Sequence, residues 1–127
     1  MEYLDLDEVL QLHELSILRY GGSLCLRDLG LLESALAAPK QTMFGDDLYS
    51  DVSAKAAILL YSLVKNHPFV DGNKRTGFAC LTRFLKINGF ILNASNDELY
   101  QFAMDTATSV LNKDQVTEWI RSRLQDA

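Results

Sequence analysis

The 127-residue sequence has few of the residues that mark disordered, disulfide-linked or membrane-spanning chains. It contains two prolines, two cysteines and seven glycines, which excludes collagen-like repeats and low-complexity linkers. Neither Cys25 nor Cys80 lies in a paired CxxC spacing, so we expect both to be small buried apolar residues. The longest apolar run, residues 56–61, is too short to cross a bilayer.

Positive charge is also scarce. Twelve basic residues against seventeen acidic ones give a net charge of −5, which disfavours a broad contact with DNA, RNA or anionic lipid. Residues 1–5 lack the basic flank of a secretory signal. We therefore expect a cytoplasmic protein with no direct nucleic-acid or membrane partner.

Apolar residues are plentiful, at 48% of the chain, and no internal repeat or polar linker divides it. We expect one compact domain over residues 1–127. Helix caps and helical periodicity predict an all-α bundle of about six helices. The expected helices cover residues 5–20, 28–38, 51–67, 72–87, 95–110 and 112–124. Residues 40–50 have no clean period and predict an irregular flap, and residues 90–93 allow a short extended piece.

A polar, sharply turning segment, residues 67–75, lies between two of the apolar helices. Residues 65–86 contain five basic residues and one acidic residue, although the chain as a whole is acidic. A local cationic focus in an acidic protein indicates a small anionic ligand.

The order of residues in this segment suggests a polyphosphate. Gly72 and Asn73 at a helix start leave backbone N–H groups free for phosphate, and Lys74 and Arg75 add charged donors. Asp71 would be repelled by bound phosphate unless a divalent cation lay between them, which implies Mg²⁺, although Asp at this position also suits a helix cap. His67 fits a general base for a hydroxyl.

Two further polar residues of the first helix have structural alternatives. Arg19 either reaches the anion site or closes its own helix by interacting with the helix dipole. His13 lies on a helix face beside apolar residues, and we expect it to be structural.

The segment His67-Pro68-Phe69-Val70-Asp71-Gly72-Asn73-Lys74-Arg75 resembles the signature of the Fic/Doc family, and its Lys74 is similar to the Doc branch. Residues 13–36 also resemble that group, so the likeness covers most of the chain. The resemblance implies an all-α fold. It also implies that His67 is the base that deprotonates a target hydroxyl, that Asp71 holds Mg²⁺, and that residues 72–75 hold the phosphates of ATP.

The Doc resemblance further implies a toxin of a toxin–antitoxin module that transfers phosphate from ATP to a protein, such as elongation factor Tu. AMP transfer is the alternative enzyme reaction. Lys74 stands where the commoner Fic pattern has Gly, and Phe78 where it has Arg, and both departures disfavour AMP transfer. A catalytically inactive antitoxin-binding module is a second alternative.

Inhibition is expected to come from a second protein. Self-inhibited Fic proteins carry a Glu followed by Gly or Asn, and none of the six glutamates of this chain has that neighbour. The resemblance therefore implies a cognate antitoxin, a segment of which would lie in a groove of the bundle.

Overall fold

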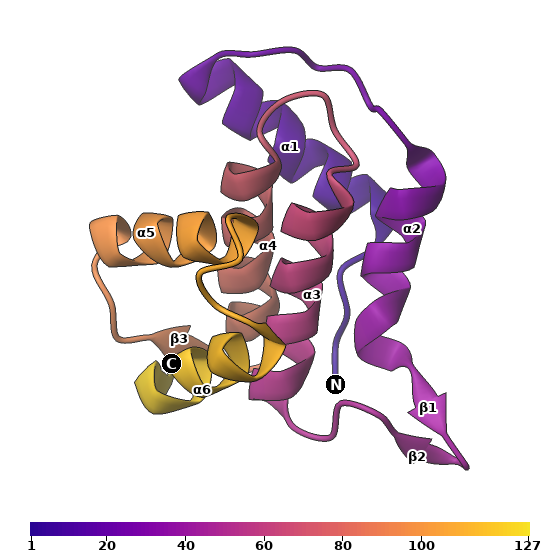
Figure 1. The fold of residues 1–127 in the computed structure, drawn as a ribbon, viewed down its shortest axis with the longest axis vertical. Helices are drawn as coiled ribbons and strands as arrows, with labels where there is room; N and C mark the ends of the chain where they lie inside the picture. Colours follow the sequence, from indigo (N-terminus) through magenta and orange to yellow (C-terminus); the bar gives the residue numbers. More distant parts are fainter.

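A computed structural model describes all residues, 1–127, and shows a helical bundle built around one antiparallel helix pair (Figure 1). The six helices are α1 (Leu6–Tyr20), α2 (Leu29–Ala37), α3 (Val52–Asn66), α4 (Asn73–Ile87), α5 (Asn96–Ala107) and α6 (Lys113–Arg123). The smaller elements are the 3₁₀ turn η1 (Ala38–Lys40) and the strands β1 (Thr42–Met43), β2 (Asp46–Asp47), β3 (Phe90–Leu92) and β4 (Leu124–Asp126). The predicted all-α class is confirmed. No helix combines the length and the apolar character that a membrane span needs.

Side-chain caps begin five of the six helices. Each cap is an Asp, Ser or Asn whose oxygen accepts a hydrogen bond from the backbone N–H three residues further on, and the caps are Asp5, Asp28, Asp51, Ser95 and Asn112. The exception is α4, which begins after Gly72 with no side-chain cap. The first N–H groups of α4 are therefore left without a side-chain partner.

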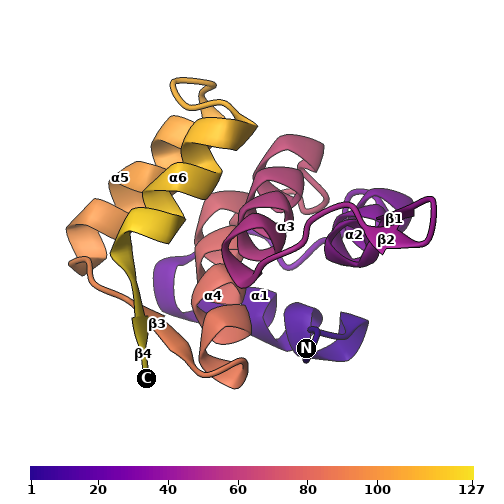
Figure 2. The ribbon, with the colours of Figure 1, turned by 90° about the horizontal axis from the view of Figure 1, so that it is seen from below.

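The helix pair α3 and α4 forms the centre of the core, with α1 and α2 on one side and α5 and α6 on the other (Figure 2). The two central helices are in close contact at Gly77. A Cβ atom at that position would lie 3.0 Å from Val64 Cγ1 and 3.2 Å from Leu60 Cδ1. This contact leaves no room for a larger side chain, so the two helices hold the turn between them in a fixed position.

The segment predicted as an irregular flap, residues 40–50, contains a short regular pairing. The segment is a short antiparallel hairpin in which Thr42 pairs with Asp47 and Met43 with Asp46. In Figure 1 it lies at the opposite end of α3 from the α3–α4 turn, so it covers no part of that turn. The hairpin is held by Lys55, whose buried Nζ lies 3.2 Å from the Asp47 carboxylate and 3.1 Å from the Pro39 carbonyl.

The C-terminal residues also differ from the prediction. The last helix ends at Arg123, and Leu124 begins strand β4, which pairs with the extended piece predicted near residues 90–93. The fifth helix ends at Ala107 rather than near residue 110, and Val110 is exposed. Helical periodicity predicted both helices to end later than they do. It could not locate their ends because the pairing with β3 and the turn after α5 depend on contacts distant in sequence.

The two cysteines differ from each other. Cys80 is buried in the core as expected, and this burial raises the pKa of its thiol well above the ordinary value. Cys25 is exposed, so the expectation that it is buried is wrong. Cys25 lies in the connection between α1 and α2, which contacts the α3–α4 turn through its backbone, and this leaves the side chain in solvent.

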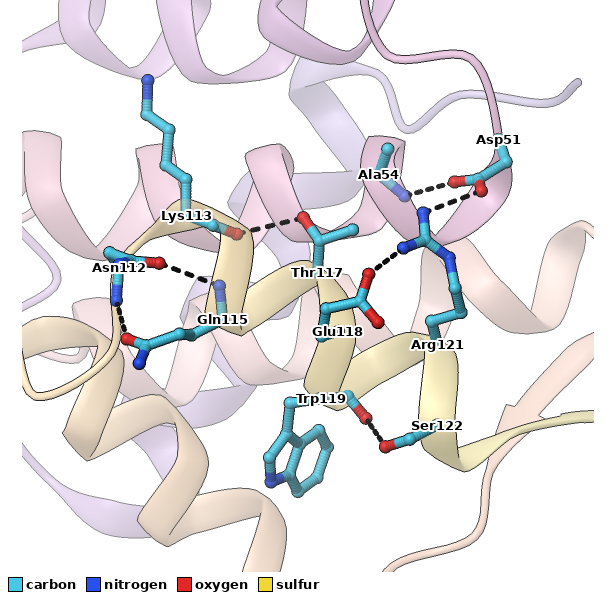
Figure 3. A network of polar contacts seen from close by, with 10 residues as sticks. All are labelled: Asp51, Ala54, Asn112, Lys113, Gln115, Thr117, Glu118, Trp119, Arg121 and Ser122. Carbon is cyan, nitrogen blue, oxygen red and sulfur yellow. Dashed lines mark hydrogen bonds and ion pairs between the residues drawn. The ribbon is translucent and has the colours of Figure 1, made fainter.

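A polar network joins α6 to the start of α3 (Figure 3). The Arg121 guanidinium lies 2.9 Å from the Asp51 carboxylate and also pairs with Glu118. The hydrogen bond from the Ala54 N–H, and to a lesser extent Arg121, lower the pKa of the Asp51 carboxyl, with partial burial opposing them. Asp51 thus caps α3 and ties it to α6.

Because the pKa of Asp51 is lower in the folded state, the unfolded chain binds the proton more tightly. This contribution to the free energy of unfolding is present above the unfolded pKa of about 3.9 and is lost as the pH falls through the folded pKa. Asp51→Asn keeps a capping oxygen but cannot titrate. Urea unfolding between pH 2 and 7 should therefore show that the free energy of unfolding falls less with acid in Asp51→Asn than in the parent. An identical fall in both proteins would contradict this role of Asp51.

Candidate active site

A pocket of about 520 Å³ opens beside the α3–α4 turn, where the C-terminal end of α1 and the start of α4 meet. It brings together all but one of the site residues predicted from the sequence. These are His67, Asp71, Gly72, Asn73, Lys74 and Arg75. Helix α1 also contributes Ile17 and Tyr20 to the lining, and α5 contributes Tyr100.

The turn itself contains two residues in the left-handed backbone region. His67 ends α3 with φ 54° and ψ 54°, and Gly72 precedes α4 with φ 80° and ψ 18°. A non-glycine residue in this region is strained and persists only when its surroundings hold it there. His67 is exposed and lines the pocket, so the candidate base lies in the same pocket as the start of α4.

Arg27 holds the strained end of α3. Its Nε donates to the His67 carbonyl at 2.6 Å, and its Nη2 donates to the Asn66 carbonyl at 2.8 Å. These carbonyls are among the last of the helix and have no intrahelical donor, so a guanidinium there both satisfies them and favours the helix dipole. Backbone bonds from Arg27 and Asp28 to the Pro68 carbonyl continue the contact along the turn.

The side chain of Asn73 is used within the turn. It accepts from the Phe69 N–H at 2.9 Å and donates to the Phe69 carbonyl at 2.8 Å, and the residue is 4% exposed. This pair of hydrogen bonds closes the turn onto the first residue of α4. We therefore assign the Asn73 side chain to holding the turn, and its phosphate contact stays a prediction for its backbone N–H.

The start of α4 can act as an anion cradle. The first intrahelical bond runs from the Thr76 N–H to the Gly72 carbonyl at 2.9 Å, which leaves the N–H groups of residues 73–75 without intrahelical partners. No side chain caps them. A phosphate beside Gly72 would satisfy these groups and the positive end of the helix dipole.

Asp71 precedes Gly72 and lines the same pocket. One oxygen of its carboxylate accepts from the Ser23 N–H at 2.7 Å, and no cation of the chain pairs with it. No group of three or more His, Cys, Asp or Glu residues gathers into a cage. A single carboxylate beside a phosphate site fits Mg²⁺, which is commonly held by one or two carboxylates, substrate phosphates and water.

Lys74 and Arg75 also form no ion pair within the chain. The Arg75 guanidinium lies over the Tyr20 ring, 3.7 Å from its centroid, and 5.0 Å from the centroid of Tyr100. Stacking between two rings orients the guanidinium while leaving its N–H edge free to donate. Two unpaired cations in one pocket favour binding of an anion with more than one phosphate.

Two residues considered in the sequence lie outside the pocket. Arg19 and Phe78 both line the adjoining groove between α1, α4 and α5, and neither lines the pocket. Arg19 stands in the last turn of α1, where a cation is favoured by the helix dipole. Position 78 thus adds no charge to the phosphate side of α4.

The fold and this pocket define a helical domain with a candidate anion site at the start of its fourth helix, and comparison with known proteins identifies the family of this domain. The family profile described as the Fic/DOC family matches residues 3–85. The chain therefore belongs to the Fic/DOC family.

Two relatives refine this assignment. The chain is 44% identical over 112 residues to Toxin Doc of Mycolicibacterium smegmatis, which covers 88% of this chain and 79% of that relative. It is 26% identical over 121 residues to Protein kinase doc of Escherichia phage P1, covering 95% and 94% of the two chains. This family member is thus similar to Doc toxins along most of its length.

Sequence reasoning missed several residues that build the site. Arg27 lies within residues 13–36, which resemble the Fic/Doc family, but sequence patterns assign it no separate role, although its guanidinium binds the last carbonyls of α3. Tyr20 ends the first helix, is 56% exposed and stacks on Arg75, a contact that its place in the helix does not predict. Tyr100 has no local signal at all, because its contact with Arg75 depends on how α5 packs.

Because the Asn73 side chain makes two buried hydrogen bonds, we expect its removal to destabilise the protein. Asn73→Ala would leave the N–H and the carbonyl of buried Phe69 without partners, at a cost of about 1–3 kcal/mol in the free energy of unfolding. Asn96→Ala is the matched control, because Asn96 also opens a helix but is exposed and makes no side-chain hydrogen bond. Urea unfolding of both variants measures the difference, and equal losses would contradict the role of Asn73.

Proposed function

We propose that this protein is a Doc-type toxin that transfers the γ-phosphoryl group of ATP to a Ser or Thr hydroxyl of a protein. The observation that carries the proposal is the gathering of His67, the uncapped start of α4 and two unpaired cations around one pocket. The relative from Escherichia phage P1 is named a protein kinase, which supports the same reaction. Because the reaction needs ATP, it belongs in the cytoplasm.

Each group has a defined task in this reaction. His67 accepts the proton of the target hydroxyl as its oxygen forms a bond to the γ-phosphorus. The bond between that phosphorus and the β–γ bridging oxygen breaks, and ADP leaves. The backbone N–H groups of residues 73–75, Lys74 and Arg75 hold the phosphates and stabilise the charge of the transferring group. Asp71 would hold Mg²⁺, which neutralises phosphate charge when it is bound.

Transfer of AMP from the same pocket is the competing reaction. Lys74 stands in the cradle, and position 78 offers no cation to the phosphates because Phe78 lies in the adjoining groove. Both features favour phosphate over AMP as the transferred group. The protein target is proposed to be a translation elongation factor such as elongation factor Tu.

Labelled ATP distinguishes the two reactions. With elongation factor Tu, Mg²⁺ and ATP, label from the γ-phosphate should reach the protein and label from the α-phosphate should not. The modified protein should gain about 80 Da for a phosphoryl group, whereas an adenylyl group adds about 329 Da. Label arriving only from the α-phosphate would overturn the kinase assignment in favour of AMP transfer.

Variants of the pocket test the roles within this assay. His67→Ala should lower the rate by about 10²–10⁴-fold, the usual contribution of a general base. Lys74→Ala should lower it by about tenfold or more, because a charged donor to phosphate is lost. The control is Lys86→Ala, an exposed lysine of the same helix that lines no part of the pocket. An unchanged rate in His67→Ala would exclude His67 as the base.

The antitoxin is proposed to bind the groove beside the pocket. This groove, of about 340 Å³, is lined by Leu12, Leu15, Arg19, Phe78 and Leu99 among others. Its apolar lining and its cations suit an amphipathic helical segment that carries acidic residues. Tyr20 and Arg75 line both the groove and the pocket, so a segment bound in the groove would also contact the phosphate site.

A pair of surface variants tests this partner. Leu15→Asp places a carboxylate in the groove and should weaken binding of the antitoxin encoded beside this protein by about tenfold or more, as measured by calorimetry. Leu48→Asp is the control, since Leu48 is a similarly exposed leucine beside the hairpin. Equal affinities of the two variants would contradict the groove assignment.

A further inference from the structure

We propose that His13 of α1 is a positioning residue for the Asp71–Gly72 corner of the active-site turn. This inference rests on the proposed function, because the corner matters only if it holds the metal and the phosphates. The claim that His13 holds the turn does not depend on that function, and His13 takes no part in the proposed reaction.

His13 makes two contacts with the turn at once. Its ring stacks on Phe69, with 3.7 Å between the ring centroids and 6° between the planes. Its Nε2 lies 2.8 Å from the Asp71 carbonyl oxygen. Because a carbonyl only accepts hydrogen bonds, Nε2 carries the proton and donates it. The side chain is 3% exposed, so no water replaces this donor at low cost.

Packing alone does not require a histidine here. The neighbours of His13 on the buried face of α1 are Val9 and Ile17, and an apolar residue would continue that stripe. A polar ring on this face is instead matched to one acceptor, the carbonyl just before Gly72. The hydrogen-bond donor of His13 therefore stabilises the turn and is not needed for core packing.

The contact restrains Asp71 from its backbone side, while another contact restrains its side chain. The Ser23 N–H donates to one carboxylate oxygen at 2.7 Å, and His13 donates to the main-chain carbonyl of the same residue. With both ends held, the second carboxylate oxygen of Asp71 has a restricted set of positions. In the proposed function, this second oxygen would hold Mg²⁺.

The same helix also sets the position of Gly72. A Cβ atom built on Gly72 would lie 3.7 Å from Nε2 and Cδ2 of His13 and 3.1 Å from Cδ1 of Ile17. Helix α1 therefore packs directly against the residue that opens the anion cradle. Loss of the His13 bond would free the Asp71–Gly72 peptide and move both the carboxylate and the first N–H groups of α4.

Two substitutions and one control separate positioning from general stability. His13→Leu fills the space but has no donor, whereas His13→Gln keeps a donor near the position of Nε2. Val9→Ala is the control, because Val9 is fully buried one turn earlier on the same face and contributes to the core. Thermal unfolding of all three variants reports the loss of stability that each change causes.

Phosphate transfer is then measured at varied ATP and Mg²⁺ concentrations. His13→Leu should raise the KM for ATP and the Mg²⁺ concentration needed for half-maximal rate by about tenfold, the size expected for one lost hydrogen bond. His13→Gln should recover part of this shift. Val9→Ala should leave both values unchanged even where its melting temperature falls as far as that of His13→Leu.

Hydrogen exchange of the ligand-free protein gives a second readout that needs no activity. The Ser23 amide donates to the Asp71 carboxylate, so its exchange should be faster in His13→Leu than in Val9→Ala. Equal Ser23 exchange in these two variants, or a KM and Mg²⁺ requirement in His13→Leu equal to those of the parent, would overturn the inference. A parent protein that transfers no phosphate would overturn the proposed function instead, and the exchange result would still decide whether His13 holds the turn.

Discussion

The close contact between α3 and α4 is the constraint on which the site depends. Two antiparallel helices that touch at Gly77 leave the chain little space in which to reverse direction. The turn meets this demand with left-handed residues at both of its ends, His67 and Gly72. The reversal also exposes the first N–H groups of α4 and the imidazole of His67 to the same pocket. The geometry of the candidate active site is thus a consequence of how two core helices are joined.

A strained turn persists only when other parts of the fold hold it. Three side chains do this, from three directions: Arg27 at the end of α3, Asn73 across the turn and His13 from α1. Each bonds to a backbone group that the turn itself leaves without a partner. In consequence, these three residues shape the pocket through the backbone of the turn, and Lys74 and Arg75 stay free of ion pairs within the chain.

The unpaired positive charge of the pocket is confined to a small part of an acidic protein. Most of the chain is acidic, and its exposed ion pairs, such as Asp51 with Arg121, lie away from the pocket. Lys74 and Arg75 have no such partners, and Arg75 is held by aromatic rings instead of by a carboxylate. A guanidinium that is oriented by stacking keeps its full charge for a ligand. An ion pair at the same place would weaken the attraction for phosphate.

The sequence by itself determined the helices and the place of the site. Caps such as Asp5 and Ser95 act through bonds to residues three positions away, so local patterns locate them, and the nine residues from His67 to Arg75 are contiguous. It did not determine the hairpin near Asp47, strand β4 or the exposure of Cys25, because these depend on partners far along the chain. Only the tertiary structure decided that Arg19 lines a neighbouring groove and that Tyr20 and Tyr100 lie beside Arg75. It also decided that His13, predicted to be structural, bonds to the Asp71 carbonyl. The reason is physical: a cap or a motif is satisfied within one turn of chain, whereas these contacts exist only after separate helices have packed.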